Sequence, residues 1–293
     1  MKGFIGARQT TLASEISITG TGVHSGAPVS IILYPADGDT GLRFLLCNGD
    51  SESTEITADQ RYVTGVTLCT VLGDGNGASV ATVEHLLAAL RGLGVDNALI
   101  EIDSAEVPIM DGSSAQFVEA IDEVGLIELD APRRYLKVLK TVTVEDAGAH
   151  GELSPHNGFH LDVEIEFDCA MIGRQRIEID LNPGSFRREL SRARTFGFMK
   201  DVERLWAAGL ALGASLENTV AIGDDRIIKR EVLRYPDDYL PQKVHDAVGE
   251  GALDSQEEVR ANRRLIWQGL QQSAAGNADF TAPPGASATI TGW

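Results

Sequence analysis

A stretch of ten residues, FHLDVEIEFD from Phe159 to Asp168, alternates strictly between apolar and polar side chains. Successive side chains of a β-strand point to opposite faces, so the apolar set needs a covering layer while the polar set faces away from it. The pattern therefore predicts a half-buried antiparallel sheet, with IEIDL at residues 177–181 as the partner strand. We expect the acidic face of this strand to be solvated and not to bind a metal.

The same order of elements, strands followed by helices, occurs twice along the chain. The first half has short strand candidates and then an amphipathic helix with capping-box spacing at Ser113 and Gln116. In the second half, the strands are followed by a helical stripe of Val202, Leu205 and Trp206. This order predicts an α+β fold with two similar two-layer α/β sandwich domains packed around a shared active-site cleft.

Proline and charged residues mark the expected boundary between these domains. LDAPRRY, residues 129–135, is the best candidate linker, which gives domains at residues 1–130 and 131–273. A chain of 293 residues is long for a single core and agrees with two domains. The end of the chain, residues 274–293, is rich in Gln, Ala, Gly and Thr and is expected to be a disordered tail.

Charge and cysteine content exclude several classes of function. A net charge of −18 argues against a general nucleic-acid-binding surface, although a local basic cluster can still hold a small phosphorylated ligand. Three widely spaced cysteines, Cys47, Cys69 and Cys169, exclude a cysteine-based zinc cluster and fit a reducing compartment. The sequence has no run of eighteen apolar residues and no signal-peptide core, so we expect a soluble, cytoplasmic protein without a membrane span.

A glutamate and a histidine, Glu84 and His85, stand side by side at the start of a predicted helix. Thr82 is placed to cap the first turn of this helix. The helix dipole favours an ionised Glu84 there, and His85 can offer a neutral nitrogen to a metal. The alternative is a glutamate that compensates the dipole beside a solvated histidine.

The segment QKVHDAVGE, residues 242–250, holds further candidate metal ligands, His245 and Asp246. Two ligands from one helix are best placed four residues apart, because adjacent residues point about 100° apart. Gln242 has this spacing to Asp246 but is a poor zinc ligand, and His245 is expected to face elsewhere. From the residues alone, the metal site is incomplete.

Several long motifs occur in the order that is typical of one enzyme family: TGTGVHSG, TVEHLLAALRGLGVDNALIEID, VPIMDGSSAQFV, SRARTFGF and GASLENTVAIGDDRIIKREVLRYPDDYLPQKVHDAVGE. From about residue 8 to residue 250, the chain resembles the zinc-dependent UDP-3-O-acyl-N-acetylglucosamine deacetylases of lipid A biosynthesis in Gram-negative bacteria. The resemblance implies a Zn²⁺ cofactor and a UDP-linked acylated amino sugar as substrate. Hydrolysis of the N-acetyl group would release acetate.

The resemblance also implies roles for individual residues. Glu84 matches the general base, and His85 and Asp246 match zinc ligands. Lys243 is expected to contact the substrate. The Thr195 hydroxyl is expected to stabilise the oxyanion that develops when water attacks the acetamide carbonyl.

The chain departs from the family's pattern at two places. Gln242 stands where the family has a zinc histidine, and the sequence has no histidine after His245, so the family's catalytic acid is missing. We therefore expect a divergent or C-terminally degenerate member with little or no turnover. The alternative is a catalytically inactive paralogue or a nucleotide-sugar-binding protein. His245 can replace the lost ligand only if its helix is distorted.

Three features near these motifs have both a structural and a functional interpretation. Arg192 and Arg194 either bind a diphosphate or orient their loop. His24 is either a turn residue or a neighbour of the active site, which is its place in the family. Cys69 is expected to be an inert core residue, although the family places its counterpart near the substrate.

Overall fold

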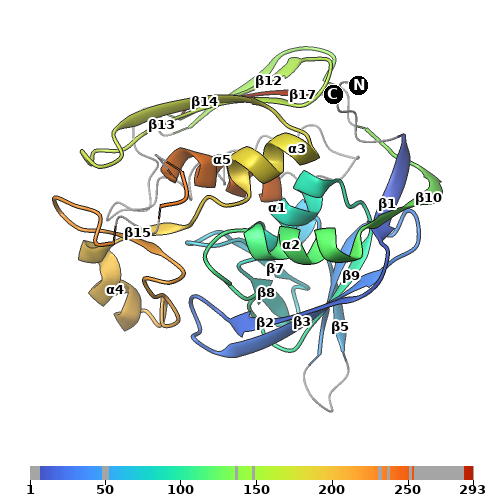
Figure 1. The fold of residues 1–293 in the computed structure, drawn as a ribbon, viewed down its shortest axis with the longest axis horizontal. Helices are drawn as coiled ribbons and strands as arrows, with labels where there is room; N and C mark the ends of the chain where they lie inside the picture. The colour runs from blue at the N-terminus through green and yellow to red at the C-terminus, as the bar shows by residue number, and fades with distance from the viewer. Residues whose placement is uncertain are drawn as a thin grey trace.

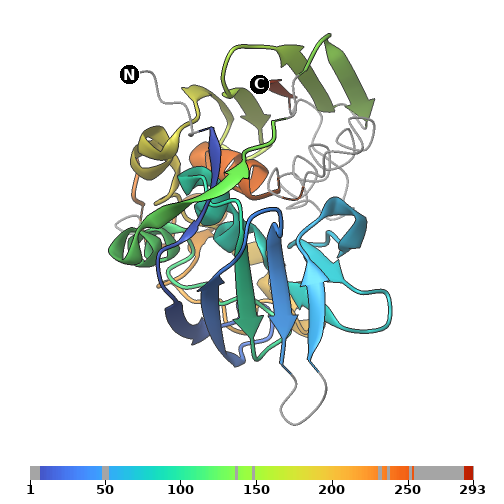
Figure 2. The same cartoon turned by 90° about the vertical axis from the view of Figure 1, so that its right-hand side faces the viewer.

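The computed structural model describes residues 7–47, 53–135, 138–146, 149–229, 233–235, 238–250, 253 and 287–292. Within these residues the fold is mixed α+β, and the main helices lie between two five-stranded sheets (Figures 1 and 2). This arrangement confirms the predicted α+β class. The division into domains at residue 130 stays a prediction.

The first five-stranded sheet has the strand order β2-β3-β9-β4-β5 and is antiparallel except between β4 and β9. Its alternating apolar residues, such as Ile31, Phe44 and Ile100, are fully buried. Their burial follows from the period of two that separates the faces of a strand. The bounds of the strands are β2 (Ile16–Thr21), β3 (Pro28–Pro35), β4 (Leu42–Leu46), β5 (Thr54–Thr57) and β9 (Ala98–Ile102).

The second five-stranded sheet has the order β11-β12-β17-β13-β14. As predicted, β13 and β14 pair antiparallel, and Leu161, Val163 and Ile165 are buried on one face. On the other face, Asp162 and Glu164 form ion pairs with arginines of β14. The bounds are β11 (Val142–Asp146), β12 (Ala149–Pro155), β13 (His160–Glu166), β14 (Arg174–Asp180) and β17 (Ser287–Gly292).

Strand β17 lies within the tail that the sequence predicted to be disordered. It pairs parallel with β12 and antiparallel with β13, so the prediction of disorder is wrong for residues 287–292. The segment SATITG contains three consecutive β-branched residues, Thr289, Ile290 and Thr291, a composition that suits a strand. The rest of the predicted tail, residues 274–286 and 293, lies outside the described residues.

The shorter elements connect these layers. Three small sheets are formed by β1 with β10, by β6, β7 and β8, and by β15 with β16. Their strands are β1 (Arg8–Leu12), β6 (Val63–Gly65), β7 (Val71–Gly73), β8 (Ser79–Ala81), β10 (Leu126–Pro132), β15 (Phe196–Phe198) and β16 (Val220–Ile222). The short helical segments are η1 (Gln60–Tyr62), α3 (Pro183–Ser185), η2 (Phe186–Leu190), η3 (Met199–Asp201) and α4 (Val202–Ala207). Among the described residues, no helix has the length and apolar character needed to cross a membrane.

The predicted linker at residues 129–135 is only partly a connection. Strand β10 extends to Pro132 and pairs with β1, and the next residue, Arg133, is buried. The Arg133 guanidinium donates hydrogen bonds to the Asp96 carboxylate at 2.9 Å and to the Gly94 carbonyl at 2.7 Å. These bonds fasten the segment to the carboxyl end of α1 (Glu84–Leu93), where a cation also interacts favourably with the helix dipole.

Two helices, α1 and α5 (Tyr239–Glu250), cross in the centre of the molecule and pack closely against each other (Figure 1). Gly249 makes the close approach possible, because a Cβ at this position would lie 2.2 Å from the Glu84 carbonyl oxygen. Gly92 on α1 similarly leaves room for the Phe186 ring, since a Cβ there would lie 2.4 Å from it. The crossing of α1 and α5 therefore depends on Gly249, while Gly92 lets Phe186 of η2 pack against α1.

The third long helix, α2 (Ala115–Val124), confirms the helix predicted in this region. It buries Phe117 and Ile121, and it ends at Gly125, which has φ +78°, as the sequence indicated. Ser114, not Ser113, is the N-cap of this helix and makes no capping hydrogen bond with its side chain, whereas the Ser113 hydroxyl accepts a 3.2 Å hydrogen bond from the Ala115 N–H.

Candidate active site

Glu84 and His85 lie in the first turn of α1, and both are buried. The predicted cap by Thr82 is wrong. Thr82 adopts a left-handed conformation with φ +57°, and its hydroxyl donates to Glu106 instead. One oxygen of Glu84 accepts a hydrogen bond from the Thr70 backbone N–H at 3.2 Å. The helix start therefore presents a buried carboxylate and a buried imidazole together.

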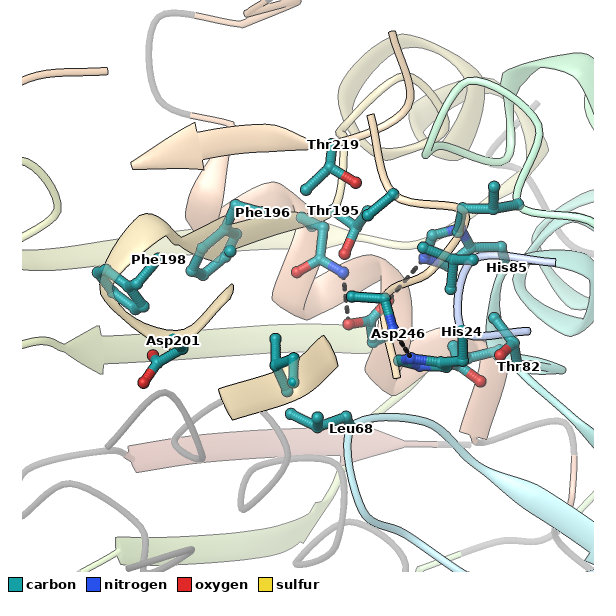
Figure 3. Close-up of a pocket in the computed structure, with 18 of the residues that line it drawn as sticks. His24, Leu68, Thr82, His85, Thr195, Phe196, Phe198, Asp201, Thr219 and Asp246 are labelled. Carbon is teal, nitrogen blue, oxygen red and sulfur yellow. Dashed lines mark hydrogen bonds and ion pairs between the residues drawn. The ribbon is translucent and has the colours of Figure 1, made fainter. Parts of the chain in front are cut away.

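Helix α5 brings Gln242, Lys243 and Asp246 to the same place. Asp246 Oδ1 lies 3.7 Å from His85 Nε2, and Figure 3 shows these two side chains pointing toward each other. Asp246 Oδ2 accepts a 2.6 Å hydrogen bond from Gln242 Nε2 and lies 3.6 Å from Lys243 Nζ. The two crossing helices thus supply opposite sides of one cluster of charged and polar groups.

A pocket opens beside this cluster and is lined by residues from both halves of the chain (Figure 3). Glu84, His85, Lys243 and Asp246 lie at its wall together with Thr195, so all five residues predicted to act in the site are brought together. The remainder of the wall includes an aromatic and aliphatic set, namely Val23, Leu68, Ile109, Phe167, Phe196, Phe198 and Leu205. The pocket wall therefore combines charged and polar groups with a set of apolar side chains.

Burial sets the protonation states of the cluster. It raises the pKa of Glu84 to about 8, and the nearby negative charge of Asp246 adds to this shift. Burial also lowers the pKa of His85 to about 4, and a positive charge on His245 would lower it further. Burial alone would raise the pKa of Asp246, but the hydrogen bond from His245 and the charge of Lys243 hold it below its usual range. His85 is thus neutral at pH 7, the form in which imidazole binds a metal.

The donor atoms of the cluster fit a divalent metal ion. His85, His245 and Asp246 each place a ligand atom within 4.8 Å of the other two. His85 Nδ1 and Gln242 Oε1 are buried and have no hydrogen-bond partner within the described part of the chain. Two imidazoles and a carboxylate are the ligand types that zinc takes in catalytic sites.

The position of His245 differs from the sequence prediction. We expected it to face away from Asp246, yet its Nδ1 lies 3.2 Å from Asp246 Oδ1 and its ring lies 4.9 Å from that of His85. The prediction failed because it considered α5 alone. The imidazole of His245 is turned toward His85 and Asp246 at the contact of α5 with α1.

Thr195 occupies the loop between η2 and β15. Its backbone N–H donates to the Gly112 carbonyl at 2.7 Å, and its carbonyl accepts from the Val220 N–H at 2.9 Å. These two bonds fix the loop, and Thr195 faces the pocket (Figure 3). A hydroxyl held in this way is suited to donate to a developing negative charge.

The structure favours the structural interpretation for Arg194 and Cys69. The Arg194 side chain is buried and donates to the Asp111 carbonyl at 2.7 Å, so it orients its loop. Cys69 is buried, and burial together with the charge of Glu84 raises the pKa of its thiol to about 12. His24 lines the pocket, as the resemblance implied.

Two further buried carboxylates near the pocket were not identified by the sequence analysis. Glu106 accepts hydrogen bonds from the backbone N–H groups of His24 and Ser25, each at 2.8 Å, and so holds the turn at the pocket wall. Burial would raise the pKa of Glu106, but these bonds keep it below its usual value. Glu250 is buried, and burial together with the charges of Asp246 and Glu84 raises its pKa well above the usual value. Its spacing of four residues from Asp246 was the available signal.

The comparisons with known proteins agree with the resemblance seen in the motifs. The sequence profile of the family described as LpxC, UDP-3-O-acyl N-acetylglycosamine deacetylase, matches residues 9–259. UDP-3-O-acyl-N-acetylglucosamine deacetylases of Brucella ovis and Brucella suis are 50% identical over 248 residues, which cover 84% of this chain and 86% of each relative. The Brucella melitensis protein of the same name is 49% identical over the same coverage. The chain therefore belongs to the UDP-3-O-acyl N-acetylglycosamine deacetylase (LpxC) family and is, by family, a metal-dependent deacetylase.

Proposed function

We propose that this chain hydrolyses the N-acetyl group of UDP-3-O-acyl-N-acetylglucosamine and releases acetate, as a cytoplasmic step of lipid A biosynthesis. The observation that carries the proposal is the convergence of Glu84 and His85 from α1 with Lys243 and Asp246 from α5 on one pocket. The names of the Brucella relatives support the choice of substrate. The apolar part of the pocket wall suits an acyl chain.

His85 and Asp246 would hold a Zn²⁺ ion, which supplies Lewis acidity toward the acetamide carbonyl and toward water when it is bound. Glu84 takes the proton of the attacking water. Glu84 would do so in its ionised form, which the positive charge of a bound ion favours, and the protonated carboxyl group could then pass this proton to the departing nitrogen. This second role matters because the sequence lacks the histidine that acts as acid in the family.

Thr195 and Lys243 would act on the substrate. The Thr195 hydroxyl donates to the developing oxyanion. Lys243 lies with its ammonium 4.9 Å from the Phe196 ring centroid and 3.6 Å from Asp246, so both its charge and its position are restrained at the pocket wall. We propose that it contacts the polar part of the UDP-linked sugar.

We further propose that the two layered halves are the family's paired sandwich domains, with a boundary near residue 130 and the active site between them. The packing of α1 against α5 supports this, since one helix comes from each half. The three cysteines are all unpaired, which agrees with a reducing cytoplasm.

The test is a deacetylation assay on UDP-3-O-acyl-N-acetylglucosamine, with the released free amine as the readout. Zinc-loaded protein should form the amine, although more slowly than family members that have both histidines, and a chelator should abolish the activity. Glu84→Gln should reduce turnover by roughly 10²- to 10⁴-fold without loss of zinc. Release of no amine from zinc-loaded protein would overturn the proposal.

The alternative function is a catalytically inactive, nucleotide-sugar-binding member of the family. Gln242 in place of a zinc histidine is the observation that favours it. In that case the same substrate would raise the melting temperature of the protein, yet no amine would be released.

A further inference from the structure

We infer that His245 is the third metal ligand in this chain and that Gln242 is a positioning residue that holds Asp246 in place. This inference rests on the proposed zinc-dependent function. In the family pattern, a histidine ligand occupies position 242. In this chain, the histidine that takes its role lies three positions later on the same helix.

The distances around Asp246 Oδ1 support this ligand set. Oδ1 lies 3.7 Å from His85 Nε2 and 3.2 Å from His245 Nδ1. A tetrahedral zinc ion with bonds of about 2.0–2.1 Å separates its ligand atoms by about 3.3 Å. The two observed separations lie on either side of this value, and all three ligand atoms lie within 4.8 Å of one another, so one ion can reach all three after side-chain movements.

The other oxygen of Asp246 is already occupied by neighbours on α5. Oδ2 accepts the 2.6 Å hydrogen bond from Gln242 Nε2 and lies 3.6 Å from Lys243 Nζ. The orientation of the Gln242 amide follows from this contact, because a flipped amide would place its carbonyl oxygen against a carboxylate. Gln242 therefore directs Oδ1 toward His85 and His245, as hydrogen-bond partners of metal ligands commonly do.

The geometry of α5 allows this change without a distorted helix. Residues 242, 245 and 246 point within about 100° of one another around a helix axis, because 242 and 246 are one turn apart and 245 lies on the other side of 242. All three positions therefore belong to the face of α5 that packs on α1. Residues 245 and 246 diverge by about 100° around the helix axis, but their side chains can still meet at one point beside the helix.

Packing holds the His245 ring in the required orientation. The residue is fully buried, and its ring stacks on Phe186 with a centroid distance of 6.2 Å and an interplanar angle of 20°. Phe186 in turn rests against Gly92 of α1. The His85 ring meets His245 edge-on at 4.9 Å. A histidine restrained on two sides costs little additional conformational entropy when it binds an ion.

The deciding experiment measures zinc affinity by competition with a chromogenic chelator, and it records the visible absorption of the Co²⁺-substituted protein. We expect His245→Ala to weaken zinc binding by roughly 100-fold or more and to change the intensity of the Co²⁺ bands. Gln242→Ala should weaken binding less, by roughly 10- to 100-fold. His150→Ala is the matched control, because His150 is only half-buried and is distant in sequence from both helices, and it should bind zinc as the unaltered protein does.

Two further variants separate loss of a ligand from loss of folding. His245→Leu keeps an apolar side chain against Phe186 and should remain folded by circular dichroism while losing zinc affinity. The double variant Q242H/H245L restores an imidazole at position 242 and should recover tight binding. Unchanged zinc affinity in both His245 variants would overturn this inference alone, whereas the absence of zinc binding in the unaltered protein would overturn the zinc-dependent function as well.

Discussion

Replacement of Gly249 by alanine is the most direct test of the helix crossing that builds the site. The new Cβ would lie 2.2 Å from the Glu84 carbonyl oxygen, 3.0 Å from the Glu84 carbonyl carbon and 3.1 Å from the Ala88 nitrogen. All three are backbone atoms of α1, so no side-chain rotation relieves the contact. An ordinary C···O contact is about 3.3–3.6 Å, and the helices must therefore separate by roughly 1 Å.

Two opposing energies determine the effect on stability. Overpacking of this kind costs about 1–3 kcal/mol, while alanine is a better helix former than glycine by about 1 kcal/mol. We expect a net loss of about 1–2 kcal/mol in the free energy of unfolding. Separation of the helices also widens the 3.7 Å gap between His85 and Asp246, so zinc affinity should fall by roughly tenfold or more.

Urea unfolding and chelator competition measure these two quantities. Gly65→Ala is a suitable control, because its new Cβ would meet only Val71 side-chain atoms at 3.4 Å, an ordinary contact. If Gly249→Ala were as stable as the unaltered protein and bound zinc equally well, the close approach of α5 to α1 would be refuted.

Three other predictions concern single polar groups. Glu106→Gln should lower stability by about 1–3 kcal/mol at pH 7 in urea unfolding, because two backbone N–H groups lose a charged acceptor. Folding lowers the pKa of Glu106, so the contribution of its carboxylate to stability is present above the ordinary glutamate pKa and is lost as the pH falls through the lower, folded value. The stability of Glu106→Gln should therefore fall less steeply than that of the unaltered protein between pH 5 and 3, and an equally steep fall would contradict this. Arg133→Ala should cost about 3–5 kcal/mol because it leaves Asp96 and the end of α1 without their cation, and a double-mutant cycle with Asp96→Asn should give a coupling energy clearly above zero. Glu84→Gln should raise the melting temperature of the metal-free protein at pH 9. Folding raises the pKa of Glu84 to about 8, so this group destabilises the fold increasingly as the pH rises from the ordinary glutamate pKa to about 8, and fully above it; an unchanged melting temperature at pH 9 would oppose this explanation.

Patterns with a clear period were the most informative part of the sequence. The alternation through residues 159–168 predicted β13 and its partner correctly, and Gly125 marked the end of α2. Both depend on interactions between near neighbours, so local residue patterns determine them. Thr82 was misjudged because its hydroxyl finds Glu106, a partner 24 residues away, and no local rule indicates such a contact.

The candidate site was predictable in its members but not in its arrangement. Motifs identified Glu84, His85, Thr195, Lys243 and Asp246, which line one pocket. The orientation of His245 depends on Phe186, on the His85 ring and on Gly249, which lets α5 approach α1. Such packing between distant segments leaves no periodic signal along the chain.

The position of the ligands along the chain has a consequence for folding. His85 and Asp246 are separated by roughly 160 residues, and they meet only where α1 crosses α5. An ion bound there would close a very long loop, and a partly folded chain in which either helix is undocked would have no complete site. Each tenfold rise in free zinc above its dissociation constant would then add about 1.4 kcal/mol to global stability. Zinc would therefore stabilise only those chains in which α1, from the first third of the sequence, has already docked against α5, from the last third.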